Sequence, residues 1–455
     1  MKLLGDNRLV QSAFRSDTFA EQIDKYIDQL DRLELVKVNG RVSEVIGLVI
    51  ESVGPTTSLG DVCSIRSRDG EELCLSEVVG FRSNRVLSMV LGSVSSISPG
   101  SEIVASGKTL SVGVGMNLLG RVLNGLGRPM DGMGQIEPEE TRSIHRAPPN
   151  PLERKRIIEP ISSGIRSIDA LLTMGKGQRI GIFAGSGVGK SVTLGMIARN
   201  SSADVNVIAL VGERGREVRD FIEKELGEEG LKKSVLVVAT SDQASLIRVK
   251  ASLIATTIAE YFRDRGLDVL LMMDSVTRVA MAQREVGLTI GEPPTTKGYT
   301  PSVFALLPQL LERAGNAKRG SITGMYTVLV EGDDMNEPIA DAARSILDGH
   351  IVLSRKLASA GHYPAVDVLE SISRVMPDVT APDHRKAATY ILDLMATYHE
   401  AEDLINIGAY VKGSSQKIDK AVSAIERIRS FLKQGIDETS ELDNAIKGLM
   451  ELTTK

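Results

Sequence analysis

The chain reads Ala184-Gly185-Ser186-Gly187-Val188-Gly189-Lys190-Ser191 at the point that decides its fold. The apolar run before it, residues 179–183, predicts a buried strand, and residues 192–198 predict the beginning of a helix. A glycine-rich turn between a strand and a helix N-terminus makes an anion site, because successive backbone N–H groups point into one space. The stretch matches G-x-x-x-x-G-K-[ST], except that Ala184 replaces the first glycine. It predicts a nucleotide phosphate-binding loop rather than a connector without function.

Each part of this loop has an expected role. The backbone from Gly185 through Val192 is expected to surround the phosphates, because its glycines allow a tight turn. The ammonium group of Lys190 can reach the β- and γ-phosphate oxygens. The hydroxyl of Ser191 is placed to ligate Mg²⁺. The loop therefore predicts ATP and Mg²⁺ as the bound species.

The composition is that of a soluble globular protein of about three domains. Of the 455 residues, 42% are hydrophobic and 25% are charged, and there is no tryptophan. Few aromatic side chains and a net charge of −5 do not favour nucleic-acid binding, although a locally basic channel would not show in the sum. No apolar run is long enough to cross a membrane and no secretory signal begins the chain, so we expect a cytoplasmic protein.

The N-terminal residues 1–35 form a distinct segment. Between about residues 18 and 33, apolar side chains recur at helical spacing with charged residues of both signs between them. This pattern predicts an amphipathic helical arm, which would serve as a core helix, a partner-binding arm or a membrane-surface helix. The mixed charge favours a protein partner over anionic lipid.

The rest of the chain divides into three parts. Residues 36–106 predict a small β-barrel, because short β-rich runs at 41–51, 61–67, 72–81 and 85–91 alternate with turn residues. Residues 107–382 predict an α/β domain with a mainly parallel sheet, since strand-like and helical patterns alternate. Its expected strands are 179–183, 205–211, 235–239, 269–273 and 325–330. Residues 383–455 predict helices, with breaks at Gly408, Gly413 and Gly435.

Two carboxylates follow apolar strands of the α/β domain. Asp274 ends the run Leu270-Leu271-Met272-Met273, where a magnesium-binding acid belongs in an open α/β sheet. An aspartate there is also a common helix N-cap, and its coupling to the phosphate-binding loop favours the functional interpretation. Glu213 follows the run 205–211 and could deprotonate the attacking water. From spacing alone, a solvated charge cluster is an equal interpretation of Glu213.

A further motif connects these residues to a known family. It reads Gly361-His362-Tyr363-Pro364-Ala365-Val366-Asp367-Val368-Leu369-Glu370-Ser371-Ile372-Ser373-Arg374, and with the loop it resembles the catalytic subunits of rotary ATP synthases. Residues 291–304 (GEPPTTKGYTPSVF) and 310–315 (LLERAG) are similar to the type III secretion branch, and specifically to flagellar protein-export ATPases, with the injectisome ATPases as nearest siblings. The resemblance covers nearly the whole chain. It implies an N-terminal β-barrel, a RecA-like P-loop core and a C-terminal helical domain.

The resemblance also implies roles for individual residues. It makes Glu213 the catalytic carboxylate, with Arg214 beside it, and Arg278 a nucleotide-site arginine. It makes Arg374 an arginine finger that reaches the γ-phosphate of a neighbouring subunit, against the alternative of a structural salt bridge. Tyr363 matches the aromatic residue that packs on adenine, against the alternative of an ordinary core tyrosine.

Tyr410 is a further candidate, for the other side of the base. The five histidines, in contrast, show no ligand spacing, so no metal other than Mg²⁺ is expected.

An arginine that acts on a neighbour implies that activity requires a ring, and the family implies a homohexamer. By the same analogy, the C-terminal helices would contact substrate–chaperone complexes and the N-terminal arm a regulatory or stator protein. The chain would dock on export-gate proteins at the cytoplasmic face of the inner membrane. It would use ATP hydrolysis to deliver, unfold or release export substrates.

Other functions use the same motifs. A non-catalytic subunit of a mixed ring is disfavoured by Glu213, since loss of that carboxylate is the simplest way to abolish hydrolysis. A proton-coupled synthase subunit is disfavoured by the segment Glu292-Pro293-Pro294. A RecA-like nucleic-acid translocase would need exposed aromatics in the barrel, and only Phe81 lies between Lys37 and Ser106.

Overall fold

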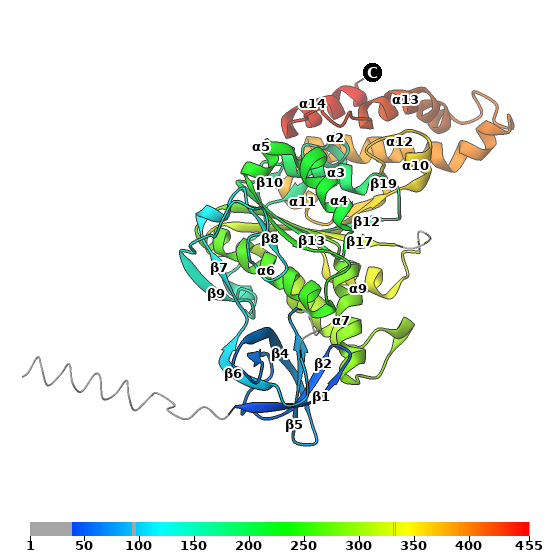
Figure 1. The fold of residues 1–455 in the computed structure, drawn as a ribbon. Coiled ribbons are helices and arrows are strands. Elements are labelled where there is room, and N and C mark those ends of the chain that lie inside the picture. The colour runs from blue at the N-terminus through cyan, green and yellow to red at the C-terminus, as the bar shows by residue number, and fades with distance from the viewer. Residues whose placement is uncertain (1–38, 93–96, 331, 333, 455) are drawn as a thin grey trace, which may run out of the picture.

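The structure is a computed structural model that describes residues 39–92, 97–330, 332 and 334–454. Three parts lie one above another along the molecule (Figure 1), with a barrel at the bottom, a sheet covered by helices in the middle and a layer of helices at the top. The amphipathic arm expected over residues 1–35 lies outside the described residues.

The first part is a closed six-stranded barrel with the order β1-β2-β5-β4-β3-β6. Its strands are β1 (Gly40–Ile46), β2 (Val49–Val53), β3 (Asp61–Arg66), β4 (Glu72–Arg82), β5 (Arg85–Val90) and β6 (Glu102–Thr109). The single run expected over 41–51 is wrong, because the chain turns back at Gly47, whose φ of 60° suits glycine, and forms a hairpin. Strand β6 was not expected and continues past residue 106.

The middle part is built on one large sheet with the order β19-β18-β12-β17-β15-β13-β14-β8. These strands are β8 (Val122–Asn124), β12 (Arg179–Ala184), β13 (Val205–Val211), β14 (Ser234–Ala239), β15 (Asp268–Asp274), β17 (Ser321–Leu329), β18 (Gly349–Leu353) and β19 (Val366–Ser373). All neighbours in this order are parallel except β18 and β19. The five strands expected from apolar runs are confirmed, because a strand covered on both faces is apolar throughout.

Helices cover both faces of this sheet (Figure 1). On one side lie α2 (Arg166–Leu171), α3 (Lys190–Asn200), α4 (Gly215–Asp220) and α5 (Gly227–Lys232), and on the other α6 (Ser245–Asp264), α7 (Val276–Ile290) and α9 (Pro338–Ile346). The shorter elements are β7 (Ser111–Val114), η1 (Met116–Leu118), β9 (Glu140–Ser143), η2 (Pro151–Glu153), β10 (Pro160–Ile161), β11 (Met174–Gly175), η3 (Phe221–Leu226), η4 (Thr296–Gly298), α8 (Pro301–Leu311), β16 (Gly315–Asn316), α10 (Arg355–Ser359) and α11 (Met376–Val379).

The top part consists of α12 (Pro382–Asn406), α13 (Gln416–Leu432) and α14 (Leu442–Thr453). The glycine breaks fall between these helices, as expected. Buried side chains such as Ile391, Ile428 and Leu449 belong to the same hydrophobic cluster as Ile168 and Leu194 of the middle part. The helical layer is therefore packed onto the nucleotide-binding domain rather than tethered to it.

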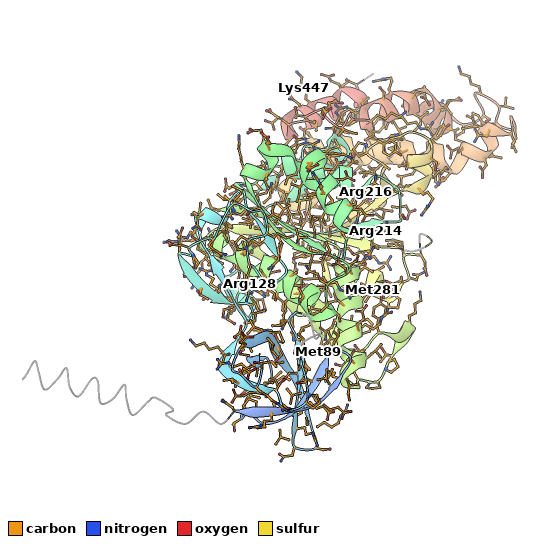
Figure 2. The ribbon with its side chains drawn as sticks, viewed as in Figure 1. Met89, Arg128, Arg214, Arg216, Met281 and Lys447 are labelled. Carbon is orange, nitrogen blue, oxygen red and sulfur yellow. The ribbon has the colours of Figure 1, made fainter. Side chains whose placement is uncertain are left out.

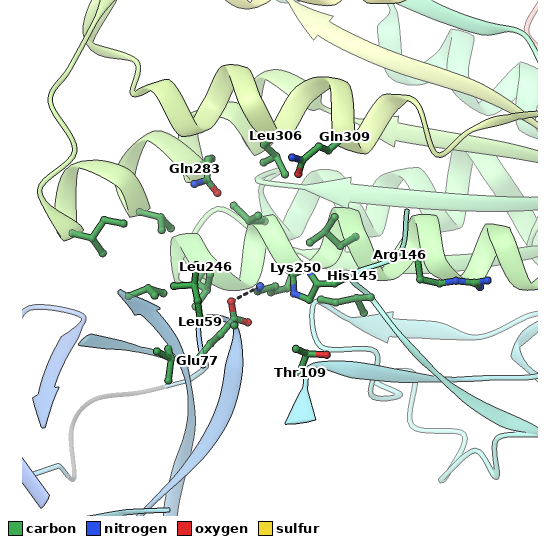
Figure 3. A pocket seen from close by; sticks show the side chains of 18 of the residues that line it. Leu59, Glu77, Thr109, His145, Arg146, Leu246, Lys250, Gln283, Leu306 and Gln309 are labelled. Carbon is green, nitrogen blue, oxygen red and sulfur yellow. Dashed lines mark hydrogen bonds and ion pairs between the residues drawn. The ribbon is translucent and has the colours of Figure 1, made fainter. Parts of the chain in front are cut away.

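A cavity of about 590 Å³ lies between the barrel and the middle part (Figure 3). The ammonium group of Lys250 on α6 is 2.6 Å from the carboxylate of Glu77 on β4, and both side chains are buried. This ion pair joins the two parts directly. Among the described residues, no helix has both the length and the apolar character that crossing a membrane requires.

Candidate nucleotide-binding and hydrolysis site

The predicted phosphate-binding loop joins β12 to α3, as the sequence indicated. Gly187 and Gly189 have φ values of 77° and 86°, a left-handed conformation in which a larger side chain would be strained. Val188 between them is buried in the hydrophobic cluster on the face of the sheet that α2–α5 cover, and Ser186 and Gly187 are exposed. The loop is thus anchored by one apolar side chain while its backbone faces solvent at the N-terminus of α3.

The parallel sheet brings two carboxylates to the same edge as this loop. The Nζ atom of Lys190 is 2.5 Å from Oδ1 of Asp274, the last residue of β15. It is 3.4 Å from Oε1 of Glu213, which follows β13. The three side chains are only 6–13% exposed. Residues that follow or end three separate strands therefore form one buried cluster, which we call the lysine–carboxylate cluster.

The charges of this cluster shift one another's protonation. Burial raises the pKa of Glu213, and the nearby charge of Asp274 raises it further against the opposing effect of Lys190. Burial by itself would lower the pKa of Lys190, but the charges of Asp274 and Glu213 outweigh it and raise this pKa above its usual value. Lys190 thus stays charged, and Glu213 is a stronger base than an exposed glutamate.

Thr327 is a site residue that the sequence analysis missed. Its hydroxyl donates to Oδ1 of Asp274 at 2.6 Å, and the residue is completely buried in β17. Strand β17 lies between β12 and β15, so Thr327 is next to the end of both. A polar residue within the apolar run 325–330 was the available signal.

The two arginines predicted near Glu213 differ in position. Arg278, in the first turn of α7, packs against Gly212, because a Cβ atom on that glycine would lie 2.9 Å from the Cβ of Arg278. Arg214 lies beside Arg216 at the surface (Figure 2), and its guanidinium pairs with Glu217 at 2.9 Å. Its side chain is 79% exposed. The structure brings Arg278 to the cluster and directs Arg214 into solvent.

Tyr363 lies against the phosphate-binding loop. A Cβ atom on Gly189 would be 3.4 Å from Cε1 of the Tyr363 ring, and the tyrosine is 45% exposed. A half-exposed aromatic ring beside the loop suits packing against a nucleotide base. Tyr410 has another environment, since its hydroxyl donates to Asp419 and to the carbonyl of Ser415, in the connection between α12 and α13 and the start of α13.

Arg374 lies at the other end of the parallel strands, near their amino ends, whereas the phosphate-binding loop lies at their carboxyl ends. Its backbone N–H donates to the carbonyl of Asp348, and the N–H of Asp348 donates to the carbonyl of Arg179, the first residue of β12. The phosphate-binding loop begins at the last residue of the same strand, about 17 Å away for six residues of extended chain. Arg374 is exposed. This separation is farther than a single arginine side chain spans.

A phosphate-binding loop beside a lysine–carboxylate cluster, at the carboxyl edge of a parallel sheet, defines the class of RecA-like nucleotide-binding proteins. Three family models match the chain. They are the beta-barrel domain of the ATP synthase alpha/beta family over residues 42–107, the nucleotide-binding domain of the same family over 164–373, and the C-terminal domain of the type III secretion ATPase EscN over 380–451.

Individual relatives agree with these matches. A flagellum-specific ATP synthase of Bacillus subtilis (strain 168) is 57% identical over 430 residues, which are 94% of this chain and 98% of the relative. A type 3 secretion system ATPase of Xanthomonas euvesicatoria is 50% identical over 425 residues, which are 93% of this chain and 96% of the relative. The solved structure of the assembled ATPase EscN from enteropathogenic E. coli superposes with a TM-score of 0.87 at 46% identity, covering 91% of this chain and all of that one.

The chain therefore belongs to the ATP synthase alpha/beta family and, within it, to the branch of flagellar and type III secretion ATPases. The predicted family, the class of enzyme and the three-part fold are confirmed.

Proposed function

We propose that this chain is a ring-forming ATPase of a flagellar protein export apparatus, and that it couples Mg-ATP hydrolysis to the delivery, unfolding or chaperone release of export substrates. The lysine–carboxylate cluster at the phosphate-binding loop carries the hydrolytic part of this proposal. The flagellar assignment draws support from the 57% identity to a flagellum-specific relative, against 50% to a type 3 secretion system relative.

In the proposed mechanism, the backbone from Gly185 through Val192 surrounds the phosphates. Lys190 exchanges its bond to Asp274 for a phosphate oxygen, which frees the Asp274 carboxylate. Glu213 then orients the attacking water and accepts its proton, a role that its raised pKa supports. Arg278, which packs beside Glu213, adds positive charge near the γ-phosphate.

Ser191 and Asp274 would hold Mg²⁺. The exposed hydroxyl in the first turn of α3 and the carboxylate at the end of β15 are oxygen donors of the kind that this ion prefers. When bound, magnesium supplies positive charge to the oxygens of the phosphoryl group that is transferred. Thr327 orients Asp274 for this contact through its hydrogen bond.

The position of Arg374 supports a site shared between subunits. Because this arginine lies at the amino end of β12, it serves the loop of a neighbouring copy rather than its own. The related EscN has been solved as an assembled ATPase, and also in complex with its central stalk EscO. We therefore propose a homohexamer in which each site takes Glu213 from one subunit and Arg374 from the next.

The remaining proposals follow the family. The chain acts in the cytoplasm and docks peripherally at the inner membrane on export-gate proteins. Its C-terminal helices contact substrate–chaperone complexes and a stalk protein, and its N-terminal arm binds a regulatory or stator protein. Tyr363 packs on the adenine, and Arg214, the residue after Glu213 in the sequence, acts as an auxiliary catalytic residue although its side chain here points into solvent.

Mixing two inactive variants tests the shared site. Glu213→Gln removes the base and Arg374→Ala removes the finger, so each homogeneous ring is expected to bind ATP without turnover. If dilute subunits of both kinds are combined and then concentrated, about a quarter of the sites in random rings pair an intact base with an intact finger. We expect ATPase activity to reappear in the mixture. A mixture that stays inactive, although both chains assemble together, would contradict the shared site.

A further inference from the structure

The segment between α13 and α14 contains two buried polar residues, Gln434 and Ser440, and Gln434 is the one with the larger polar side chain. Its neighbours Lys433 and Gly435 are exposed, whereas Gln434 is only 5% exposed. A buried amide is stable only when its hydrogen-bonding groups find partners. The partners of Gln434 come from parts of the chain that are far apart in sequence.

The side chain of Gln434 joins the helical layer to the nucleotide-binding domain. Its Nε2 group donates to the carbonyl of Gly164 and to the carbonyl of Glu438, each at 2.8 Å. Its Oε1 atom accepts from the backbone N–H of Arg166 at 2.8 Å. Both amide donors and the acceptor are therefore used, and together they hold the backbone of residue 434 in place.

That backbone in turn holds the tyrosine beside the phosphate-binding loop. The N–H of Gln434 donates to the carbonyl of Tyr363 at 2.9 Å. The Tyr363 ring lies against Gly189 of the loop. A continuous set of contacts thus runs from the helical layer, through Gln434 and Tyr363, to the nucleotide site.

A second residue supports the same segment from outside. One guanidinium nitrogen of Arg166 donates to the carbonyls of Phe431 at 2.9 Å and Lys433 at 3.2 Å. Another forms an ion pair with Glu438. Arg166 therefore binds both ends of the segment that contains Gln434, and does so nearer the surface.

We propose that Gln434 is a positioning residue for the nucleotide base. By fixing the backbone that hydrogen-bonds Tyr363, it sets where the tyrosine ring stands, and the C-terminal helical layer thereby contributes to affinity for the base. This inference rests on the proposed role of Tyr363 in packing on adenine. It assigns to the helical layer a part in nucleotide selection, and Gln434 is the residue that transmits it.

The test measures the contribution of the base to binding separately from that of the phosphates. Equilibrium binding of ADP and of pyrophosphate, each with Mg²⁺, is measured by calorimetry on the full chain and on Gln434→Met, which keeps the side-chain volume but loses the hydrogen bonds. Stacking on an aromatic ring contributes enough that we expect ADP affinity to fall about tenfold. Pyrophosphate lacks a base, so its affinity should stay unchanged. In steady state, KM for ATP should rise by a similar factor with little change in kcat.

Three further variants complete the design. Gln416→Met changes an exposed glutamine of the same helical layer and should leave both affinities unaltered. Tyr363→Ala should reproduce the loss for ADP, and combining it with Gln434→Met should add little, because both act on one contact. Arg166→Ala loosens the segment without altering a buried amide and should lower ADP affinity in the same selective way. If Gln434→Met does not fold, Arg166→Ala tests the positioning role in its place.

Equal losses for ADP and pyrophosphate, or no loss for either, would overturn the positioning role. A chain that binds ADP selectively through Gln434 but never hydrolyses ATP would instead contradict the proposed enzymatic function and leave this inference standing.

Discussion

In the proposed magnesium site, Thr327 would orient Asp274 toward the ion, because its hydroxyl is a hydrogen-bond partner of that carboxylate inside the sheet. Residues that orient metal ligands typically change metal affinity by tenfold or more when removed. We therefore expect Thr327→Val, which keeps the shape of the side chain, to raise the Mg²⁺ concentration for half-maximal ATPase activity about tenfold. A magnesium titration at saturating ATP measures it.

Thr323→Val is the matched control for this prediction. Thr323 is also completely buried in β17, but its hydroxyl accepts from the N–H of Gly177 and not from the site. It should lower stability without altering the magnesium dependence. Equal shifts in both variants would show that the effect comes from the strand and not from Asp274.

The protonation of Glu213 predicts the acid side of the pH profile. As the proposed base, Glu213 must be deprotonated to accept a proton, so we expect activity to fall as the pH drops through its raised pKa, which lies above the ordinary value of 4.5. The hydrogen bond that protonated Glu213 donates to the carboxylate of Glu217 contributes to that increase. Glu217→Ala should therefore move the acid limb of kcat/KM to lower pH.

The control is Glu223→Ala, which removes an exposed partner of Arg219 and should not move the acid limb. An unchanged limb in Glu217→Ala would contradict the assignment of this limb to Glu213.

Which residues could be predicted from the sequence depends on how local their signal is. The phosphate-binding loop was predictable because the glycines, Lys190 and Ser191 are adjacent in the chain. Asp274 and Glu213 were predictable as ends of apolar strands. Thr327 and Gln434 were not, because their roles depend on contacts with residues 53 and 71 positions or more away. A polar residue inside an apolar run singles out Thr327, but no local pattern identifies the distant group that Thr327 or Gln434 contacts.

At the scale of elements, the pair of Lys250 on α6 and Glu77 on β4 joins the barrel to the core (Figure 3). Burial raises the pKa of Glu77, and the charge of Lys250 opposes that shift. Removing one partner leaves the other charge buried and unpaired, which costs about 3–5 kcal/mol. We expect Lys250→Met to lower the free energy of unfolding by this amount, as measured by denaturant titration. The loss should be smaller at acid pH, where Glu77 becomes protonated.

Two variants check that burial is the cause. Arg248, also on α6, pairs with Glu285 at 2.5 Å, and Glu285 is 47% exposed. Arg248→Ala should cost only about 0–1 kcal/mol. The double variant Glu77→Leu/Lys250→Met removes both buried charges and should recover most of the lost stability. A double variant that is as unstable as Lys250→Met would indicate lost packing in place of an unpaired charge.

The elements that the sequence predicted well are those with uniform patterns. Strands of the large sheet are apolar throughout because both of their faces are covered, so each appears as an uninterrupted run. The barrel was harder, since Gly47 is the only turn residue between β1 and β2, and β6 contains the polar stretch Ser106 to Thr109. Strand β8 has only three residues, and only its place beside β14 makes it a strand.

For the whole molecule, a shared site makes activity depend on assembly. If the proposed shared site is right, a lone chain at low concentration has the base Glu213 without an arginine finger from a neighbour, so we expect ATPase activity per chain to rise with protein concentration until rings are complete. Arg374→Ala should assemble to the same extent, as measured by light scattering, without the rise. Constant activity per chain across concentrations at which scattering shows monomers would contradict a site built from two subunits.

Strand β8 has a practical meaning for anyone dividing this chain into pieces. Its residues Val122, Leu123 and Asn124 bind along β14, an entirely buried strand that would otherwise end the sheet. A fragment started at residue 164, where the match to the nucleotide-binding domain begins, would lose that cover and present an apolar strand with unpaired N–H and C=O groups. Copies of such a fragment would associate by pairing their exposed β14 strands. The shortest independently soluble catalytic unit therefore has to start upstream of Val122, within the connection between the barrel and the nucleotide-binding domain.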